Sequence, residues 1–393
     1  MVTEDVEARA LFPALESTSV AHIARQVLGR ETPQVADWRI DPIEGGMGAA
    51  TGGIYRLAGS ALDTGLRLSW SAILKIVALD TPGTQAAFEG EDHPLYWKRE
   101  VLAYTSGLLD DLPGGVSAPR CYCVVEIDGR TAWLWLEEVK DSGTGMWGLE
   151  QYAQAAECLG RFNGAYLAGR PMPKYPWLIK TGSPRGLLEH NAWIHEVIAD
   201  PRTWQHPIIR AAFPLPVRER LLKLWDERER LLRGIDRVPQ TFGHLDAWRR
   251  NMFAQGDADG SAGLTLIDWA YPGLAAVGTD AGDLFGESFC LAELGDTPPA
   301  ILDQAIFESY VAGLCEAGWR GDAKMVRFAF TAFIALKHLF LVFVSLRDAP
   351  DESRQGVWER LFGRAFEDYV QRQAVHLYYL LERAEEARRL APR

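Results

Sequence analysis

The stretch TFGHLDAWRRNMF, residues 241–253, holds a histidine, an acid and an amide side chain at short spacing. Asp246 follows His244 by two positions, and Asn251 follows Asp246 by five. The segment has neither the period of an amphipathic helix nor the alternation of a strand. These residues therefore form either a polar turn whose side chains only hydrogen-bond to one another or parts of a reactive site.

A second acid, Asp268, lies 22 positions after Asp246. Between them the segment QGDADGSAG is typical of a hairpin turn, and LTLID is typical of a strand. Such a hairpin would bring Asp268 back beside Asn251. Carboxylate and amide oxygens with open positions for phosphate are the ligands that Mg²⁺ prefers.

Lys75 lies in the middle of the apolar strand pattern AILKIV and shares one face with Ile73 and Val77. A buried lysine needs a partner because an unpaired buried charge is costly. The helical pattern that follows offers Glu100, whose neighbours Lys98 and Arg99 are expected to be solvated. A glycine-rich segment between residues 45 and 53 precedes the Lys75 strand, where a flexible loop would be able to cover phosphates.

The elements that must position these residues divide into two parts. Strand patterns with one internal helix dominate residues 1–139, and helical patterns dominate residues 140–393, interrupted by β structure at about 241–270. We therefore predict an N-terminal lobe over 1–139 and a C-terminal lobe over 140–393. The strongest helical patterns cover residues 18–30, 96–109, 149–169, 217–235, 299–318, 322–346 and 357–390.

Composition excludes several classes of protein. The formal net charge of −12 has the wrong sign for a nucleic-acid-binding protein, and no basic block stands out. The five cysteines form no CxxC pattern, which favours free thiols in a reducing compartment. The apolar run at 325–346 carries Arg327, Lys337 and His338, so it predicts a buried helix rather than a membrane span. We expect a soluble, cytoplasmic protein without nucleic-acid or membrane partners.

In chain order, a glycine-rich hairpin, a strand lysine, a helix glutamate, the HxDxxxxN stretch and a strand-borne aspartate follow one another. This order resembles the kinase-like fold of the aminoglycoside phosphotransferase and choline-kinase-like small-molecule kinases. GHLDAWRRNMF, LIDW and TDAGDLF carry the resemblance, which spans roughly residues 18–290. It implies a bilobal α+β fold, with a β-rich N-terminal lobe containing one internal helix and a larger, mainly helical C-terminal lobe.

The resemblance also implies transfer of the γ-phosphate of ATP to a hydroxyl group of a small molecule. Asp246 would accept or orient the hydroxyl proton, as the catalytic acid. Asn251 and Asp268 would hold Mg²⁺ against the phosphates. Lys75, oriented by Glu100, would contact the α- and β-phosphates.

Adenine would bind where the two lobes join. Ile73, on the Lys75 face, would cover the ring, and the backbone near Glu137 to Val139 would pair with its edge. His244 would be structural and would tie its loop to the surroundings.

Three features depart from the family pattern. Leu245 stands where the family more often has glycine. Gly46 and Gly48 are not continued into a GxGxxG pattern, which puts phosphate contacts from that loop in doubt. DFG and APE motifs are absent, which argues against a protein kinase.

Other functions compete with the kinase. A pseudokinase-like module would bind nucleotide and mediate an interaction without catalysis. A calcium loop in DADGSAGLTLID would place Asp257, Asp259 and Asp268 at its first, third and twelfth positions, but Ala262 occupies the sixth, where glycine is needed. No GxSxG pattern supports a nucleophilic hydrolase.

The sequence leaves the acceptor and the oligomeric state open. Asp280, Asp283, Glu287 and Glu293 would be able to attract a cationic substrate, but acids there also cap helices, and Asp283 is expected to brace the catalytic loop. Aminoglycosides, sugars, choline-like amines and macrolides all remain candidates.

Overall fold

The computed structural model describes residues 17–43, 50–79, 81, 86–141, 147–213, 216–256, 262–290 and 297–392. Most of the glycine-rich segment, including Gly45, Gly46 and Gly48, therefore lies outside the described residues. So do the start of the proposed calcium loop, at residues 257–261, and the candidate acid Glu293.

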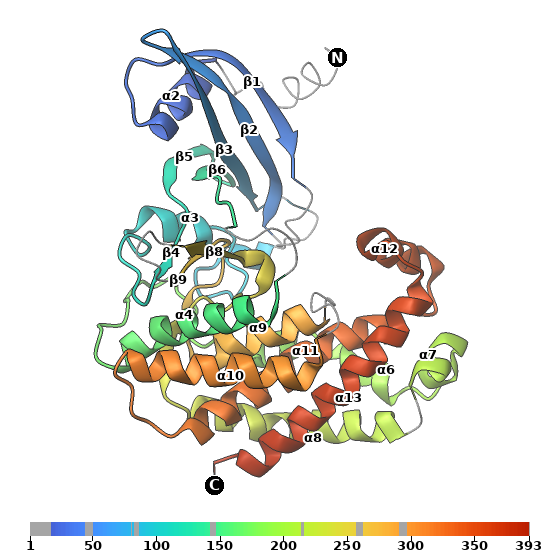
Figure 1. Cartoon of the computed structure of the whole chain (residues 1–393). Helices are drawn as coiled ribbons and strands as arrows, with labels where there is room; N and C mark the ends of the chain where they lie inside the picture. Colours follow the sequence, from blue (N-terminus) through green and yellow to red (C-terminus); the bar gives the residue numbers. More distant parts are fainter. Residues whose placement is uncertain are drawn as a thin grey trace.

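An antiparallel sheet forms the N-terminal part of the molecule (Figure 1), with five strands in the order β1-β2-β3-β6-β5 among the described residues. Helix α2 covers one face, and α3 lies on the other. These elements are α2 Ser17–Leu28, β1 Gln34–Pro42, β2 Thr51–Asp63, β3 Leu66–Ala78, α3 Arg99–Thr105, β5 Cys121–Asp128 and β6 Thr131–Glu137. The predicted β-rich part with one internal helix is thus present.

Alternate residues of β3 enter two separate apolar clusters because successive side chains point to opposite faces of a strand. Leu74 packs with Val20 of α2, whereas Val77 packs with Val101 of α3. Ile73 borders the second cluster. The predicted face shared by Ile73, Lys75 and Val77 is therefore the face that meets α3.

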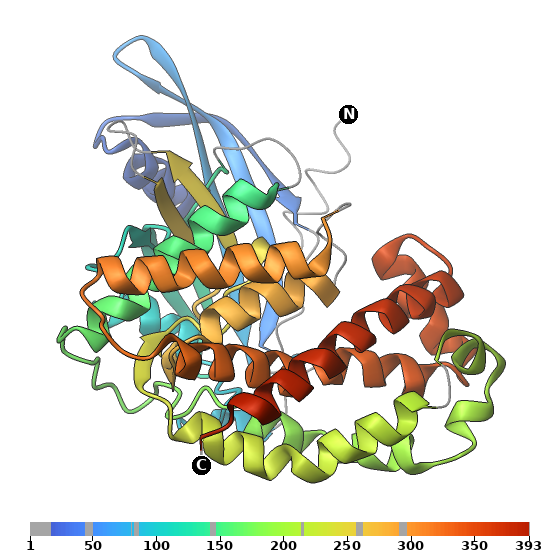
Figure 2. The same cartoon turned by 60° about the horizontal axis from the view of Figure 1, so that its bottom comes forward.

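The C-terminal part is mainly helical, and α13 packs on both α11 and α8 (Figures 1 and 2). Its helices are α4 Leu149–Leu167, α5 Arg185–His190, α6 Trp193–Ala199, α7 Pro207–Ala212, α8 Pro216–Asp236, α9 Thr279–Cys290, α10 Pro299–Glu316, α11 Ala323–Asp348, α12 Glu352–Phe362 and α13 Phe366–Leu390. Short 3-10 turns cover Ala86–Glu89, Thr203–Gln205 and Arg249–Asn251. The mixed α+β architecture agrees with the predicted fold class.

Two small sheets contain the strands of the 241–270 segment. Strand β7 (Gln240–Gly243) pairs with β10 (Gly273–Ala276), and β8 (Met252–Gly256) pairs with β9 (Ala262–Leu266). Strand β4 (Val116–Ser117) precedes residue 139 in sequence but pairs in parallel with β9. The chain before β5 thus already contributes a strand to the sheet that carries the 241–270 segment.

The single helical pattern predicted at 357–390 is wrong, because two helices occupy it. Gly363 ends α12 in the left-handed conformation, with φ 62°, and its amide donates to the Glu359 carbonyl. Glycine adopts this conformation without the steric cost that a side chain adds.

The apolar run at 325–346 forms most of α11. Val326, Phe328 and Ile334 are fully buried in the main core, and a buried helix is what the charges in the run predicted. In the part of the chain that the structure describes, no helix has the length and apolar character needed to cross a membrane.

Helices α4 and α10 approach until their backbones touch. A Cβ atom added to Gly160 would lie 2.1 Å from the Tyr310 carbonyl oxygen, and one added to Gly313 would lie 2.1 Å from the Glu157 carbonyl oxygen. Both distances are far below van der Waals contact, so glycine is required at both positions. The close approach lets the Tyr310 hydroxyl donate to Asn163 Oδ1 on α4, at 2.7 Å.

We predict that Gly160→Ala lowers the free energy of unfolding by about 2 kcal/mol, because overpacking outweighs the better helix propensity of alanine. Urea denaturation would measure this loss. Gly129→Ala is the matched control, since nothing lies within 4 Å of its added Cβ. An equal, small effect of both substitutions would contradict the backbone contact.

Candidate active site

The stretch 241–253 begins as strand β7, leaves it after Gly243, and enters β8 through the 3-10 turn Arg249–Asn251. The turn brings Asn251 back to Asp246. Asn251 Nδ2 donates to the Asp246 carbonyl oxygen at 3.0 Å and to Asp246 Oδ2 at 2.8 Å. Because both amide protons are used in this way, Asn251 Oδ1 is left as the acceptor of the amide group.

The predicted hairpin is confirmed by β8 and β9, which pair from Met252 opposite Leu266. The Ile267 amide donates to the Asn251 carbonyl at 3.0 Å, so Asp268 leaves β9 beside Asn251. Asp268 adopts φ 61°, a left-handed conformation that is uncommon for residues other than glycine. Such strained positions cluster at functional sites.

Lys75 joins the sheet to this hairpin. Its Nζ lies 2.7 Å from Glu100 Oε2 on α3 and 2.8 Å from Asp268 Oδ1. The Lys75 and Glu100 side chains are only 7% and 4% exposed, and Asp268 is 24% exposed. The predicted Lys75–Glu100 pair is present, and Asp268 extends it.

Burial and ion pairing shift the pKa values of Lys75 and Glu100 in opposite directions. Burial lowers the pKa of Lys75, but Asp268 and Glu100 outweigh it and raise the pKa above its ordinary value. Burial raises the pKa of Glu100 to about 7, although Lys75 opposes the rise. Lys75 is therefore a fixed ammonium between two carboxyl groups.

Asp246 has the electrostatic character of a proton acceptor. Burial raises the pKa of Asp246 to about 7, with Lys337 opposing the rise and the charges of Asp283 and Asp268 adding to it. A carboxyl group with a pKa near neutrality accepts a proton more readily than an ordinary surface aspartate does.

Buried acids of α9 hold the backbone on both sides of Asp246. Asp280 accepts from the amides of His244, at 3.1 Å, and Leu245, at 2.9 Å. Asp283 accepts from the Ala247 amide at 3.1 Å, as expected for a brace of the loop. Leu245 adopts φ 64°, a conformation that favours glycine, so these bonds also hold a strained residue in place.

His244 is structural in its contacts. It is fully buried, Nε2 lies 2.9 Å from the Ile267 carbonyl oxygen, and its ring packs edge-on against Trp269. Burial lowers the pKa of His244. The imidazole thus links the loop to the end of β9 as a neutral group.

A buried polar network behind the loop was not anticipated from sequence. Asn163 of α4 donates to the Phe242 carbonyl at 2.9 Å and to Asp280 at 3.0 Å. The Tyr310 hydroxyl donates to Asn163 and accepts from the Gly278 amide at 3.0 Å. No spacing pattern connects these residues, so local sequence carried no signal for the network.

The expectation that Arg99 is solvated is wrong: the residue is 1% exposed. Its guanidinium donates to the carbonyl oxygens of His93 at 2.7 Å, Pro94 at 2.8 Å, Trp177 at 2.7 Å and Ala270 at 3.2 Å. Burial lowers the pKa of Arg99 to about 10, so it remains charged at neutral pH. Because Ala270 follows Asp268 by two residues, Arg99 fastens α3 to the Asp268 segment.

The junction between the parts is also tied to the 241–253 stretch. Arg249 pairs with Asp141 Oδ2 at 2.7 Å and lies 4.2 Å above the Trp147 ring. Asp141 follows the predicted adenine-binding residues Glu137 and Val139 closely in sequence. Arg249 is therefore a structural link, not a reactive group.

The predicted adenine-binding residues lie along β3 and the end of β6. Ile73 is half-buried and opposite Leu136, and Val139 is half-buried beyond the strand. The Glu137 amide donates to the Arg120 carbonyl at 2.9 Å. Since that donor is already used, Val139 is the better placed of the two for a new hydrogen bond.

No family model and no curated protein matches the sequence. Among solved structures, the fold is similar to an amicoumacin kinase in complex with AMP-PNP, Ca²⁺ and Ami, at 13% identity and TM-score 0.50, over 94% of this chain and 96% of that one. It is also similar to a microcompartment-associated aminopropanol kinase, at 15% identity and TM-score 0.52, over 95% and 99% of the two chains. The chain therefore has the bilobal fold of small-molecule kinases, and the predicted resemblance is confirmed for the fold.

We predict that Arg99→Leu lowers the free energy of unfolding by about 3 kcal/mol or more, because it leaves buried carbonyl oxygens without donors. The midpoint of urea denaturation would measure the change. Arg39→Leu is the control, since the Arg39–Asp41 pair is 67% and 50% exposed and should contribute less than about 1 kcal/mol. An equal loss of unfolding free energy in the two variants would show that the hydrogen bonds of Arg99 to the four carbonyl oxygens do not stabilise the fold.

Proposed function

We propose that the protein is an ATP- and Mg²⁺-dependent phosphotransferase that transfers the γ-phosphate to a hydroxyl group of a small molecule of aminoglycoside, sugar or amino-alcohol type. Residues 1–139 form the nucleotide-binding lobe, and residues 140–393 form the catalytic and substrate-binding lobe. One observation carries the proposal: Lys75 contacts Glu100 and Asp268 at 2.7 and 2.8 Å, and Asn251 contacts Asp246 at 2.8 Å. The amide of Ile267, the residue before Asp268, donates to the Asn251 carbonyl at 3.0 Å and brings the two groups of contacts together.

Mg²⁺ fits this site because of the oxygen atoms that Asp268 and Asn251 offer. Asp268 offers a carboxylate that is partly exposed, and Asn251 offers the amide oxygen that its hydrogen bonds to Asp246 leave over. These are the oxygen ligands that Mg²⁺ takes while it keeps positions for phosphate and water. Bound there, Mg²⁺ would neutralise charge on the ATP phosphates.

The chain's own groups would then position the reactants. Asp246 accepts or orients the proton of the acceptor hydroxyl, which its raised pKa favours. Lys75 contacts the α- and β-phosphates, and Glu100 keeps its ammonium in place. Ile73 covers adenine, and the backbone from Glu137 to Val139 contacts its edge.

The pseudokinase-like interaction module is the alternative in which the same residues bind nucleotide without turnover. Phosphoryl transfer needs mainly positioning and charge neutralisation. Every polar group that these two tasks require is present in the chain. This completeness favours the enzyme.

We predict that Asp246→Asn folds normally, binds ATP and lowers phosphoryl transfer at least about 100-fold, since it cannot take the proton. The measurement is ADP release with ATP and Mg²⁺ across aminoglycosides, sugars, choline analogues and macrolides. Near wild-type turnover in the variant would remove Asp246 from its role. No turnover of any acceptor, together with no Mg²⁺-dependent ATP binding by the wild type, would favour the interaction module.

We also predict that Asp268→Ala weakens ATP binding far more with Mg²⁺ than without it, because a metal ligand matters only when the metal is bound. Calorimetric titrations with and without Mg²⁺ would measure both affinities. Asp92→Ala is the control, since it removes an acid only from an exposed pair with Lys180. An equal loss under the two conditions would show that Asp268 is not a metal ligand.

A further inference from the structure

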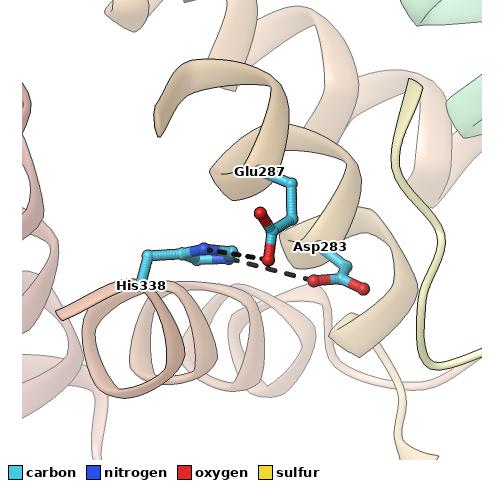
Figure 3. Close-up of side chains that lie close together, drawn as sticks. All are labelled: Asp283, Glu287 and His338. Carbon is cyan, nitrogen blue, oxygen red and sulfur yellow. Dashed lines mark ion pairs between the residues drawn. The ribbon is translucent and has the colours of Figure 1, made fainter. Parts of the chain in front are cut away.

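A second charged cluster lies between α9 and α11, next to Asp246. Asp283 and Glu287 stand one helical turn apart on α9, and His338 faces them from α11 (Figure 3). Lys337, the residue before His338, pairs with Asp283, and its Nζ lies 3.6 Å from Glu287 Oε1. The side chains of Glu287 and Lys337 are 18% and 19% exposed, whereas those of Asp283 and His338 are fully buried. Glu287 and Lys337 are therefore the members of the cluster that a ligand would meet first.

His338 points into this cluster without bonding to it. It is fully buried, and neither ring nitrogen has a hydrogen-bond partner among the described residues. Nε2 lies 3.9 Å from Asp283 Oδ1 and Nδ1 lies 3.8 Å from Glu287 Oε1. A Cβ atom at Gly286 would come within 2.0 Å of Nε2, so glycine at that position is what lets the ring lie there.

The charges of the cluster are settled by its surroundings. Burial lowers the pKa of His338 well below its ordinary value, and nearby Lys337 adds to this, so the imidazole is neutral. Burial also lowers the pKa of Lys337, but Asp283, Glu287 and Asp246 outweigh it and raise the pKa. Lys337 is thus the cation of the cluster.

The cluster is coupled to the site of phosphoryl transfer. Asp283, which pairs with Lys337, also accepts from the amide of Ala247, the residue after Asp246. An acceptor hydroxyl held at Asp246 would therefore have the Lys337 ammonium nearby. A second cation at this position would be repelled by Lys337 and would meet carboxylates that are already paired.

We infer that Lys337 is a resident cation that occupies the position at which an acceptor ammonium would otherwise bind, between Asp283 and Glu287. This inference rests on the proposed function and narrows its substrate class. The acceptor is a hydroxyl compound without a cationic amine next to the reacting hydroxyl, such as a neutral polyol or sugar. The protein thus discriminates against acceptors with an ammonium beside the reacting hydroxyl by filling the cation position with its own side chain.

A divalent metal is the other occupant that Asp283, Glu287 and His338 suggest, since their ligand atoms lie within 4.8 Å of one another. Two features favour Lys337. Asp283 faces Nε2 of His338 and Glu287 faces Nδ1, and a single metal ion can bind only one of these two ring nitrogens. The Lys337 ammonium already contacts both carboxylates, so a metal would have to displace it.

The test uses Lys337→Ala, which removes the cation and leaves space for three methylene groups and an ammonium, the size of n-propylammonium. We expect n-propylammonium to raise the melting temperature of Lys337→Ala by about 3 °C or more, as a ligand specific for the folded state does. Neutral n-propanol should not do so. Wild type and Lys337→Met, in which the methionine fills the space, should shift by less than about 1 °C.

Failure of n-propylammonium to stabilise Lys337→Ala more than Lys337→Met would overturn the inference. So would stabilisation of the wild type by n-propylammonium or by Zn²⁺, because the position would then be open. Because these melting-temperature measurements report binding, they test the inference even if no phosphoryl transfer is found. If Lys337→Ala does not fold alone, its recovery on refolding with n-propylammonium but not with n-propanol supports the inference, and equal failure with both contradicts it.

A second measurement addresses the substrate class through ADP release that depends on Asp246. We expect wild-type kcat/KM to be at least about tenfold higher for 1,2-propanediol than for 1-amino-2-propanol, which carries an ammonium beside its hydroxyl. Lys337→Ala should narrow or reverse this preference. A wild-type preference for the amine would overturn the inference, whereas absence of ADP release with every acceptor would count against the proposed function instead.

Discussion

The rest of the site depends on one buried ammonium, that of Lys75. A charge on the inner face of an apolar sheet is tolerated only with partners, and Glu100 and Asp268 are those partners. The need to pair this charge joins three separately formed elements: strand β3, helix α3 and the β8–β9 hairpin. Arg99 reinforces the same junction from the neighbouring position on α3, through carbonyl oxygens on both sides of it. The same contacts therefore pair the buried charge and shape the proposed nucleotide site.

A second constraint is the irregular backbone around Asp246. Amides in such a loop have no strand or helix partners, and leaving them unbonded in the interior would be costly. Asp280 and Asp283 supply the acceptors, and burying those acids requires further partners in turn. Asn163 and Lys337 meet that requirement from α4 and α11. The helical part thus acts as a framework for one short loop. The close approach of α4 and α10 at Gly160 and Gly313 fixes where Asn163 lies within that framework.

Two cations, Lys75 and Lys337, lie near the proposed reacting groups, and we expect different ligands beside each. Lys75 lies beside the proposed phosphate position, where a nucleotide would share it with Asp268. Lys337 lies beside the proposed acceptor position, where it neutralises acids that a cationic substrate would need. On the proposed function, a kinase-like fold would keep the same phosphate-binding residues while one helix residue changes its acceptor selectivity. Fold similarity at 13–15% identity carries no information on that residue.

Sequence alone determined what depends on local order and periodicity. The HxDxxxxN spacing, the β8–β9 hairpin and the face of Lys75 followed from short-range rules, because turns and strand alternation are set within a few residues. Glu100 was foreseen because the next helix offered one acid. Tertiary structure alone decided the partners of Arg99 and Lys337: the carbonyl oxygens around Arg99 come from up to 171 residues away, and Asp283 lies 54 residues from Lys337. The charges within the apolar run at 325–346 indicated a buried helix, but not the residues with which they pair. Periodicity gives the face of a charged side chain, but only packing brings the opposite charge to it.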